Sequence, residues 1–316
     1  MRIMVTGGAG FIGSHTVDAL LARGDEVVCI DDFNDYYSPR RKRENLTVAQ
    51  TSASFHLYES DIRDFQEMDR IFSIEKPQKV IHLAAMAGVR NSVKFPLLYE
   101  EVNVRGTLNL LELASRHGVR NFALASTSSV YGASKEIPFK EDSAATKPLA
   151  PYPATKRSCE LLAHVYHHLY GLRCTALRFF TVYGPRGRPD MTPYLFTQAI
   201  SLGREITLYD DGRPQRDFTF IEDIIGGVLA TLDADLEYEI INLGNSQPVV
   251  MRDFVTIIED LLSRQAEIVS PPLPATEPPL TYADISKARR LLGYNPTTSV
   301  EEGMRRFIDW YQQEAA

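Results

Sequence analysis

Short apolar runs alternate with longer amphipathic stretches over the first half of the chain. A short apolar run predicts a buried strand, and apolar residues at helical spacing predict an amphipathic helix. The predicted strands are Arg2–Thr6, 26–30, 54–58, 79–83, 121–125 and 173–178. The predicted helices are Phe11–Ala22, 66–72, 97–116 and 152–170. Because strands that alternate with helices build βαβ units, the pattern indicates an α/β protein with a doubly wound parallel sheet.

The pattern loosens after residue 180. Residues 184–189 are rich in glycine and proline, and prolines also interrupt residues 271–279, so both stretches are predicted to be loops. Short helices are predicted at Thr192–Leu202, 251–261 and 302–310. This second half suits a smaller lobe that lies over the carboxyl edge of the sheet.

One apolar stretch in the second half, residues 218–232, is apolar enough to return to the main sheet. The lobe is therefore not expected to be one contiguous segment. We predict a main domain over residues 1–180 with a returning segment near 217–245, and a lobe made mostly from residues 181–316.

Composition and charge narrow the class of protein. Of the 316 residues 44% are hydrophobic, which is enough for a substantial core and an appended lobe. The net charge is −7 and the basic cluster at 40–43 is short, so nucleic-acid binding is not expected. No apolar run approaches the roughly 20 residues of a membrane span. Cys29, Cys159 and Cys174 have neither metal nor disulfide spacing, which favours a reducing cytoplasm and no metal site.

Glycines recur in the turn between the first predicted strand and the first helix. Gly7, Gly10 and Gly13 let the backbone turn tightly and approach a pyrophosphate at the helix N-terminus. Asp31 ends the next strand, where a carboxylate accepts hydrogen bonds from both ribose hydroxyls of an adenosine and repels a 2′-phosphate. The pattern therefore favours NAD over NADP in a Rossmann-type domain. The structural alternative is an ordinary turn followed by a helix-capping acid.

Two further strand ends carry candidate cofactor contacts. Asp61 and Ile62 follow the third strand and suit an adenine edge, and the small residues of His82-Leu83-Ala84-Ala85 end the fourth. In an open α/β sheet, ligands bind beyond the carboxyl ends of the strands, where these segments converge.

A candidate acid–base group follows. Tyr152 and Lys156 lie one helical turn apart and so share a helix face. The pKa of a free tyrosine is about 10, and a neighbouring ammonium group favours the phenolate. Thr127 follows the fifth strand at the same edge of the sheet, where its hydroxyl suits sharing a proton with Tyr152. The alternatives are a packed tyrosine with a solvated lysine, and a simple polar turn at 126–129.

Taken together, the glycine turn, Asp31, the HLAA segment at 82–85, Thr127 and the YxxxK spacing resemble the extended short-chain dehydrogenase/reductase family. Within it they resemble NAD-dependent nucleotide-sugar epimerases. The resemblance covers essentially the whole chain, including residues 216–221 and 283–287. It implies a Rossmann-type NAD-binding domain followed by a substrate-binding lobe.

Positions that differ among these enzymes indicate which reaction follows. Ser128 and Ser129 stand where 4,6-dehydratases carry an Asp-Glu pair, and UDP-glucuronate decarboxylases carry Glu at the position of Ser129. Residues 178–191 are similar to those of UDP-glucuronate 4-epimerases, whereas UDP-glucose 4-epimerases usually have Asn at the position of Thr181. Residues 34–37 and 88–90 also look like the uronate-type enzymes.

The resemblance implies reversible C4 epimerisation of UDP-glucuronate to UDP-galacturonate through a 4-keto intermediate, with tightly bound NAD. The alternatives are a UDP-glucose or UDP-N-acetylglucosamine 4-epimerase and a catalytically silent NAD-binding regulatory protein. The implied partners are a UDP-sugar and a second copy of the chain. The family usually dimerises through two helices, which correspond here to 97–116 and 152–170.

The resemblance also implies site residues. Thr127, Tyr152 and Lys156 would be catalytic. The cofactor residues would be Gly7, Gly10, Phe11, Ile12, Gly13, Asp31, Asp32, Asn34, Asp61, Ile62, Leu83, Ala84, Ala85, Asn103, Ser126, Tyr152, Lys156 and Phe179. The substrate residues would be Gly88, Arg90, Thr127, Ser128, Ser129, Thr181, Arg188 and Arg216. Within this set, the hydroxyl groups and Arg188 would hold the uronate carboxylate, and Arg90 and Arg216 would hold the diphosphate.

Overall fold

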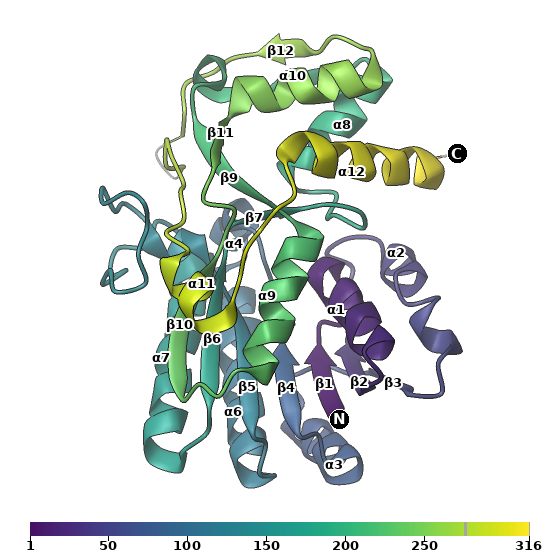
Figure 1. The fold of residues 1–316 in the computed structure, drawn as a ribbon, viewed down its shortest axis with the longest axis vertical. Helices are drawn as coiled ribbons and strands as arrows, with labels where there is room; N and C mark the ends of the chain where they lie inside the picture. Colours follow the sequence, from purple (N-terminus) through teal and green to yellow (C-terminus); the bar gives the residue numbers. More distant parts are fainter. Residues whose placement is uncertain (275–276, 316) are drawn as a thin grey trace.

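A seven-stranded parallel sheet forms the centre of the protein in the computed structural model, which describes residues 1–274 and 277–315 (Figure 1). The strand order is β10-β6-β5-β4-β1-β2-β3, and each neighbouring pair is parallel. The strands are β1 (Arg2–Thr6), β2 (Glu26–Asp31), β3 (Phe55–Glu59), β4 (Lys79–His82), β5 (Asn121–Thr127), β6 (Cys174–Phe179) and β10 (Tyr238–Leu243). The order reverses beside β1, which confirms the doubly wound α/β fold predicted from the sequence.

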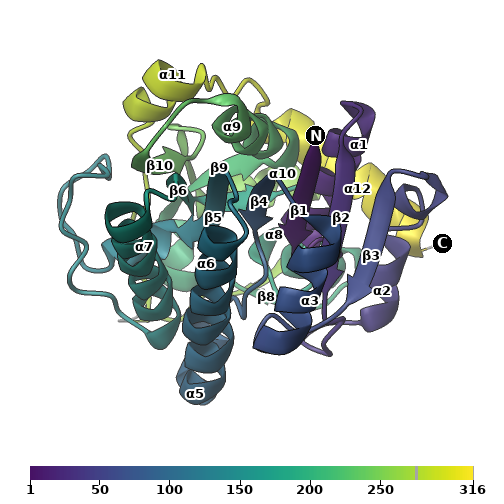
Figure 2. The same ribbon diagram turned by 90° about the horizontal axis from the view of Figure 1, so that it is seen from below.

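Helices cover both faces of this sheet (Figure 2). One face carries α3 (Phe65–Glu75), α6 (Gly106–Arg116) and α7 (Pro151–Tyr170), and the other carries α1 (Phe11–Ala22) and α9 (Ile221–Asp233). Successive residues of β1 alternate between the two cores, because Ile3 and Val5 pack on the α1 side and Met4 packs on the α6 side. The strands therefore read as continuous apolar runs, as expected for a sheet buried on both faces.

The helix predicted at 97–116 is divided. The structure has α5 (Pro96–Tyr99), a π-helical turn η2 (Glu100–Arg105) and then α6. A π-helical turn adds a residue to one helical turn and so changes the face on which the following side chains lie. Hydrophobic periodicity does not report such a turn, because it averages over several turns.

A smaller lobe lies beyond the carboxyl ends of the strands, at the top of Figure 1. It contains a three-stranded sheet, β11-β9-β7, and a two-stranded sheet, β12-β8. These strands are β7 (Thr181–Tyr183), β8 (Glu205–Thr207), β9 (Gln215–Phe220), β11 (Pro248–Val250) and β12 (Glu267–Val269). The lobe helices are α8 (Thr192–Leu202), α10 (Met251–Leu262) and α12 (Val300–Ala315). The shorter elements elsewhere are α2 (Pro39–Glu44), η1 (Ala49–Thr51), α4 (Val89–Lys94), η3 (Ser128–Tyr131), η4 (Tyr209–Gly212) and α11 (Ser286–Leu292).

The apolar stretch 218–232 returns to the main sheet as a helix. Its first residues end β9 in the lobe, and the rest form α9, which packs beside α1. The strand that joins the main sheet is β10, which follows α9 and pairs with β6. An apolar run alone does not separate a buried helix from a buried strand.

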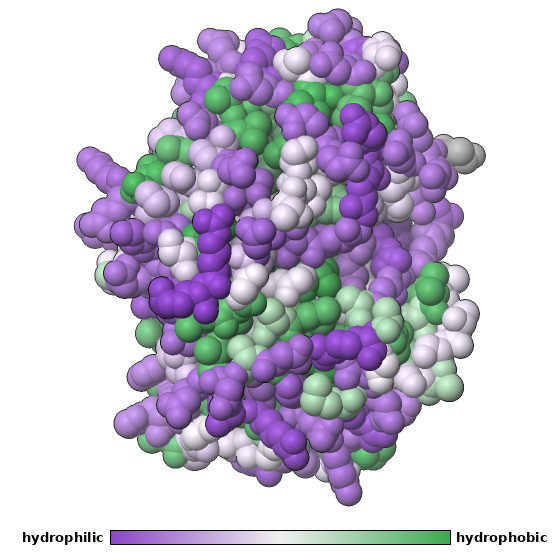
Figure 3. All heavy atoms as spheres, viewed as in Figure 1, coloured by the Kyte–Doolittle hydropathy of each residue, from purple (hydrophilic) through white to green (hydrophobic). Residues whose placement is uncertain are grey.

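The face seen in Figure 3 is mostly hydrophilic, with smaller apolar groups between the charged side chains. Among residues 1–274 and 277–315, none of the helices has the length and apolar character to cross a membrane.

Candidate active site

A cavity of about 360 Å³ lies between the carboxyl ends of the strands and the lobe. All but three of the residues predicted to bind cofactor or substrate line it. They are Gly7, Gly10, Phe11, Ile12, Gly13, Asp31, Asp32, Asn34, Asp61, Ile62, Leu83, Ala84, Ala85, Gly88, Ser126, Thr127, Ser128, Ser129, Tyr152, Lys156, Phe179, Thr181 and Arg188. The three outside the lining are Arg90, Asn103 and Arg216. The cavity also contains Tyr36, Tyr37 and Lys42, which were not predicted as site residues.

The glycine turn leaves no room for side chains. A Cβ on Gly13 would lie 2.0 Å from the carbonyl oxygen of Gly7. A Cβ on Gly7, whose φ is +70°, would lie 2.6 Å from the backbone nitrogen of Ala84. The turn is thus pressed against the segment that follows β4. Gly10 caps α1 without a side-chain hydrogen bond, so the N-terminus of the helix opens into the cavity and favours an anion there.

Asp31 stabilises this turn. Its buried carboxylate accepts hydrogen bonds from the backbone N–H groups of Ala9 at 3.0 Å and Phe33 at 2.9 Å. Burial raises the pKa of this carboxyl group, and the ammonium group of Lys42 opposes the rise. Lys42 is itself held in place because it donates to the carbonyl oxygen of Asn34 at 2.9 Å.

Tyr37 contributes a polar atom without a partner. Its buried hydroxyl has no hydrogen-bond partner among the residues that the structure describes. It lies 3.9 Å from the position of a Cβ on Gly10, beside the N-terminus of α1. A narrow backbone cradle, a helix N-terminus and an unsatisfied hydroxyl together fit the pyrophosphate of a dinucleotide.

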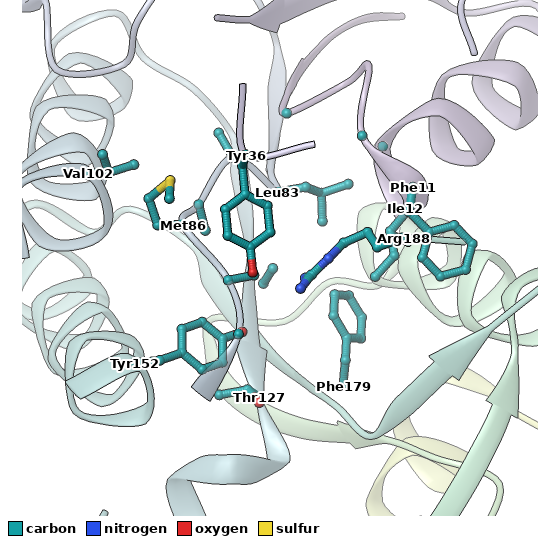
Figure 4. Close-up of a pocket in the computed structure, with 18 of the residues that line it drawn as sticks. Phe11, Ile12, Tyr36, Leu83, Met86, Val102, Thr127, Tyr152, Phe179 and Arg188 are labelled. Carbon is teal, nitrogen blue, oxygen red and sulfur yellow. The ribbon is translucent and has the colours of Figure 1, made fainter. Parts of the chain in front are cut away.

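The predicted acid–base residues meet at the far side of the cavity (Figure 4). Tyr152 projects from the first turn of α7 toward Thr127 at the end of β5. Thr127 Oγ1 also donates to Ser129 Oγ at 3.2 Å and accepts from the Ser129 backbone N–H at 3.2 Å. The hydroxyl groups of β5 and η3 therefore form one connected set next to Tyr152.

Arg188 acts on Tyr152 in addition to the cation predicted from the sequence. Burial raises the pKa of Tyr152, and Arg188 opposes that rise most, followed by the Thr127 hydroxyl. Lys156 was expected to play this part. It is fully buried on α7, and burial lowers the pKa of its ammonium group. The sequence analysis assigned Arg188 to the substrate carboxylate and not to Tyr152, because the two residues are far apart in the sequence.

Asn103 does not reach the cavity. It lies in the π-helical turn η2 and is buried. Its amide donates to the Met86 carbonyl oxygen and to Thr155 Oγ1, both at 3.0 Å, and its carbonyl oxygen accepts from the Met86 backbone N–H at 2.8 Å. Asn103 therefore ties the cavity wall after β4 to the helix that carries Tyr152, instead of lining the cofactor space as expected.

A buried ion pair lies behind the acid–base residues, and sequence reasoning missed it. Glu160 accepts two hydrogen bonds from Arg178, from Nε and Nη2, each at 2.9 Å, and neither side chain is exposed. Glu160 also accepts from Ser126 Oγ at 2.5 Å. The network joins the ends of β5 and β6 to α7. The sequence held one indication of a functional Glu160, which lies one helical turn after Lys156 and so on the same helix face.

The two arginines proposed for a diphosphate are both bound to one acid. Arg90 contacts Glu277 at 2.8 Å and Arg216 contacts it at 3.1 Å. The Arg90 side chain is 66% exposed, and neither arginine lines the cavity. The structure brings the two cations together beside the cavity, with Glu277 between them.

Comparisons with known proteins agree with this geometry. A family model described as GDP-mannose 4,6 dehydratase matches residues 4–307. The chain is 44% identical over 311 residues to a UDP-glucuronate 4-epimerase of Thermodesulfobacterium geofontis, covering 98% of this chain and 96% of that relative. It is 41% identical over 329 residues to UDP-glucuronate 4-epimerase 4 of Arabidopsis thaliana, covering 98% and 75%.

Solved structures share the whole fold. The crystal structure of UDP-glucuronic acid 4-epimerase from Bacillus cereus, in complex with UDP-glucuronic acid and NAD, superposes with a TM-score of 0.93 at 36% identity and covers 99% of this chain and 100% of that one. The UDP-glucose 4-epimerase of Thermotoga maritima with UDP-glucose has a TM-score of 0.91 at 31% identity and covers both chains fully. The chain therefore belongs to the GDP-mannose 4,6 dehydratase family, within the extended short-chain dehydrogenase/reductases.

Proposed function

We propose that this protein is an NAD-dependent epimerase that interconverts UDP-glucuronate and UDP-galacturonate at C4. The observation that carries the proposal is one cavity lined by the glycine turn, by Tyr152 and Thr127, and by further uncharged hydroxyl groups. The uronate epimerases of T. geofontis and B. cereus support it, because they match nearly the whole chain.

Tyr152 is proposed to move the proton at the sugar O4. Its phenolate takes the proton from O4 as C4 is oxidised, and the hydroxyl so formed returns the proton as C4 is reduced on the opposite face. Thr127, toward which Tyr152 points, orients O4 and shares the proton. NAD held at the glycine turn would supply the hydride acceptor, and since it is regenerated in each cycle no external oxidant is required. Lys156, four residues after Tyr152 on α7, is placed for the ribose of that cofactor.

The residues after Thr127 are proposed to favour epimerisation over the loss of water or CO2. Elimination of water needs an acid beside the sugar, and Ser128 and Ser129 have no carboxyl group. The 4-keto form of a uronate is a β-keto acid, which loses CO2 when its carboxylate bond aligns with the carbonyl π system. Ser128, Ser129 and Thr181 all line the cavity and are suited to hold the carboxylate ionised and out of that alignment. Hydroxyl donors orient a carboxylate without the cost of a buried ion pair.

A neutral-hexose 4-epimerase is the second candidate. The T. maritima UDP-glucose 4-epimerase has nearly the same fold, which favours this reading. Thr181 argues for the uronate, because UDP-glucose 4-epimerases usually have Asn at this position of the cavity wall.

The decisive experiment is a product assay on separate UDP-sugars without added NAD. We expect UDP-glucuronate to give UDP-galacturonate with little CO2, and UDP-glucose and UDP-N-acetylglucosamine to react much more slowly. Turnover of a neutral sugar but not of the uronate would select the second candidate. NAD that copurifies with a protein inactive on every sugar would instead indicate a regulatory protein. The Tyr152→Phe variant is the control for contaminating activity.

The proposal includes a homodimer in the cytoplasm. Leu161, Val165 and Leu169 lie at successive turns of α7 and are 54%, 43% and 60% exposed, and Leu108 on the adjacent α6 is 38% exposed. An apolar stripe across two neighbouring helices suits a four-helix contact with a second copy. Light scattering should give the mass of a dimer, and Val165→Asp should give that of a monomer. A monomeric parent protein would exclude the contact.

A further inference from the structure

One carboxylate joins two loops that are far apart in the sequence. Arg188, between β7 and α8, donates from Nε to Asp190 Oδ1 at 2.9 Å and from Nη2 to Oδ2 at 2.6 Å. Tyr36, in the loop after β2, donates its hydroxyl to the same Oδ2 at 2.9 Å. The paired fork restricts the guanidinium to one orientation. Asp190 therefore connects the lobe to the loop after β2, which also lines the cavity.

A third segment closes against this contact. Gly88 has a φ of +100°, and a Cβ there would lie 2.7 Å from the Tyr36 hydroxyl and 3.6 Å from Arg188 Nη2. The wall after β4 thus packs directly on the pair. Figure 4 shows the Arg188 guanidinium and the Tyr36 hydroxyl both pointing into the middle of the cavity, on the side of Tyr152.

We propose that Asp190 and Tyr36 are positioning residues. They hold the guanidinium group of Arg188 inside the cavity, on the side of the Tyr152 hydroxyl. The proposal rests on the proposed role of Tyr152 as the acid–base group. Arg188 is 19% exposed and Asp190 is 39% exposed, so the guanidinium is the better shielded member of the pair. None of the described residues accepts a hydrogen bond from Arg188 Nη1.

The surroundings of Tyr152 show why the position of Arg188 matters. Burial raises the pKa of Tyr152, and Tyr99 of α5 and Cys159 of α7 add to the rise. Arg188 and the Thr127 hydroxyl lower it, and Arg188 contributes more. If Arg188 moved away, the largest contribution that lowers the pKa of Tyr152 would be lost.

Asp190 could act on Tyr152 in two ways, by positioning Arg188 or by neutralising its charge. Replacing Asp190 distinguishes them, because the two roles predict shifts of opposite sign in the pKa of Tyr152. If Asp190 positions Arg188, Asp190→Asn frees the guanidinium, and the pKa of Tyr152 rises. If Asp190 only neutralises Arg188, the guanidinium stays in place with its charge uncompensated, and the pKa of Tyr152 falls.

The test is an NMR titration of the NAD-loaded protein carrying ¹³Cζ-labelled tyrosine. The Tyr152 signal is assigned by its absence in Tyr152→Phe. We expect Asp190→Asn to shift the titration to higher pH by on the order of one unit. Tyr36→Phe removes one hydrogen bond and no charge, and should shift it by less in the same direction. Asp35→Asn removes a charge from the exposed part of the same loop and should leave it unchanged. A shift to lower pH, or none, in Asp190→Asn would overturn the proposal.

Turnover gives a second readout. Asp190→Asn should lower kcat for the uronate more than it raises KM, and Asp190→Glu should restore part of kcat. A higher KM with an unchanged kcat would indicate that Asp190 contacts the substrate instead of positioning Arg188. Because the titration needs no turnover, an absence of epimerase activity in the parent protein would defeat the proposed function while the NMR shift still decides the role of Asp190.

Discussion

The cavity has a cofactor half around the glycine turn and a sugar half around Tyr152, and the two are formed by different parts of the chain. The cofactor half is mainly backbone, where Gly7 and Gly13 leave no space for a Cβ. The sugar half is mainly side chains that arrive from separate elements, with Thr127 on β5, Tyr152 on α7 and Arg188 on a lobe loop. In the backbone half, an added side-chain atom should weaken cofactor binding. In the side-chain half, removal of one group should remove only the function of that group.

The largest effect should come from the sugar half. Tyr152→Phe removes the group proposed to accept and return the O4 proton and should lower kcat by about 10²- to 10⁴-fold. The cofactor cradle is untouched, so NAD should still copurify in amounts equal to the parent protein. The measurement is single-turnover kinetics together with NAD released on denaturation. Activity within a few-fold of the parent would remove Tyr152 from the mechanism.

The cofactor half should respond to the addition of one carbon atom. Gly13→Ala places a Cβ 2.0 Å from the Gly7 carbonyl oxygen, so the turn must open. We expect NAD affinity to fall on the order of 100-fold, equivalent to about 2.7 kcal/mol. Titration calorimetry of protein stripped of cofactor measures this directly.

The matched control for that substitution is Gly226→Ala. Gly226 lies in α9, and a Cβ there meets nothing within 4 Å. It should leave NAD affinity unchanged and raise stability by up to about 1 kcal/mol, since alanine favours a helix more than glycine does. Equal losses of NAD affinity in the two variants would mean that the close approach at Gly13 is not what holds the cofactor.

Tyr37 tests whether the cofactor half also depends on a side chain. Its buried hydroxyl beside Gly10, which has no partner among the described residues, is proposed to donate to the pyrophosphate. A hydrogen bond to a charged group contributes about 1.5–3 kcal/mol, so Tyr37→Phe should weaken NAD binding by about tenfold or more. The ring and its packing remain, and the melting temperature of the cofactor-free protein should not fall. If NAD affinity is unchanged, the cradle is made by backbone alone.

The contrast between the halves also explains what the sequence could predict. Gly7, Gly10, Gly13 and Asp31 were recognisable because a tight turn, a helix start and a strand end are local features of the chain. The same holds for the doubly wound parallel sheet, since alternating strands and helices leave few topologies open.

Side chains that act across the fold were harder to assign. Arg90 and Arg216 were assigned to a diphosphate from their charge, which stays a prediction, and the sequence did not indicate that both contact Glu277. Asn103 was placed on the cofactor, and the π-helical turn directs it to Met86 instead. Each assignment depended on a partner or a helix register that residue type and spacing do not reveal.

The smallest effect should come from removing one hydroxyl of the sugar half. Thr181→Val keeps the shape of the side chain and removes one donor from the set that includes Ser128 and Ser129. One neutral hydrogen bond contributes about 0.5–1.5 kcal/mol, so KM for UDP-glucuronate should rise about three- to tenfold with kcat nearly unchanged. CO2 should appear beside the epimer, because the carboxylate is held less firmly. Binding of UDP-glucose, which has no carboxylate, should not change. If both sugars weaken equally, Thr181 supports the cavity wall instead of selecting the uronate, and the division between a backbone half and a side-chain half would not extend to specificity.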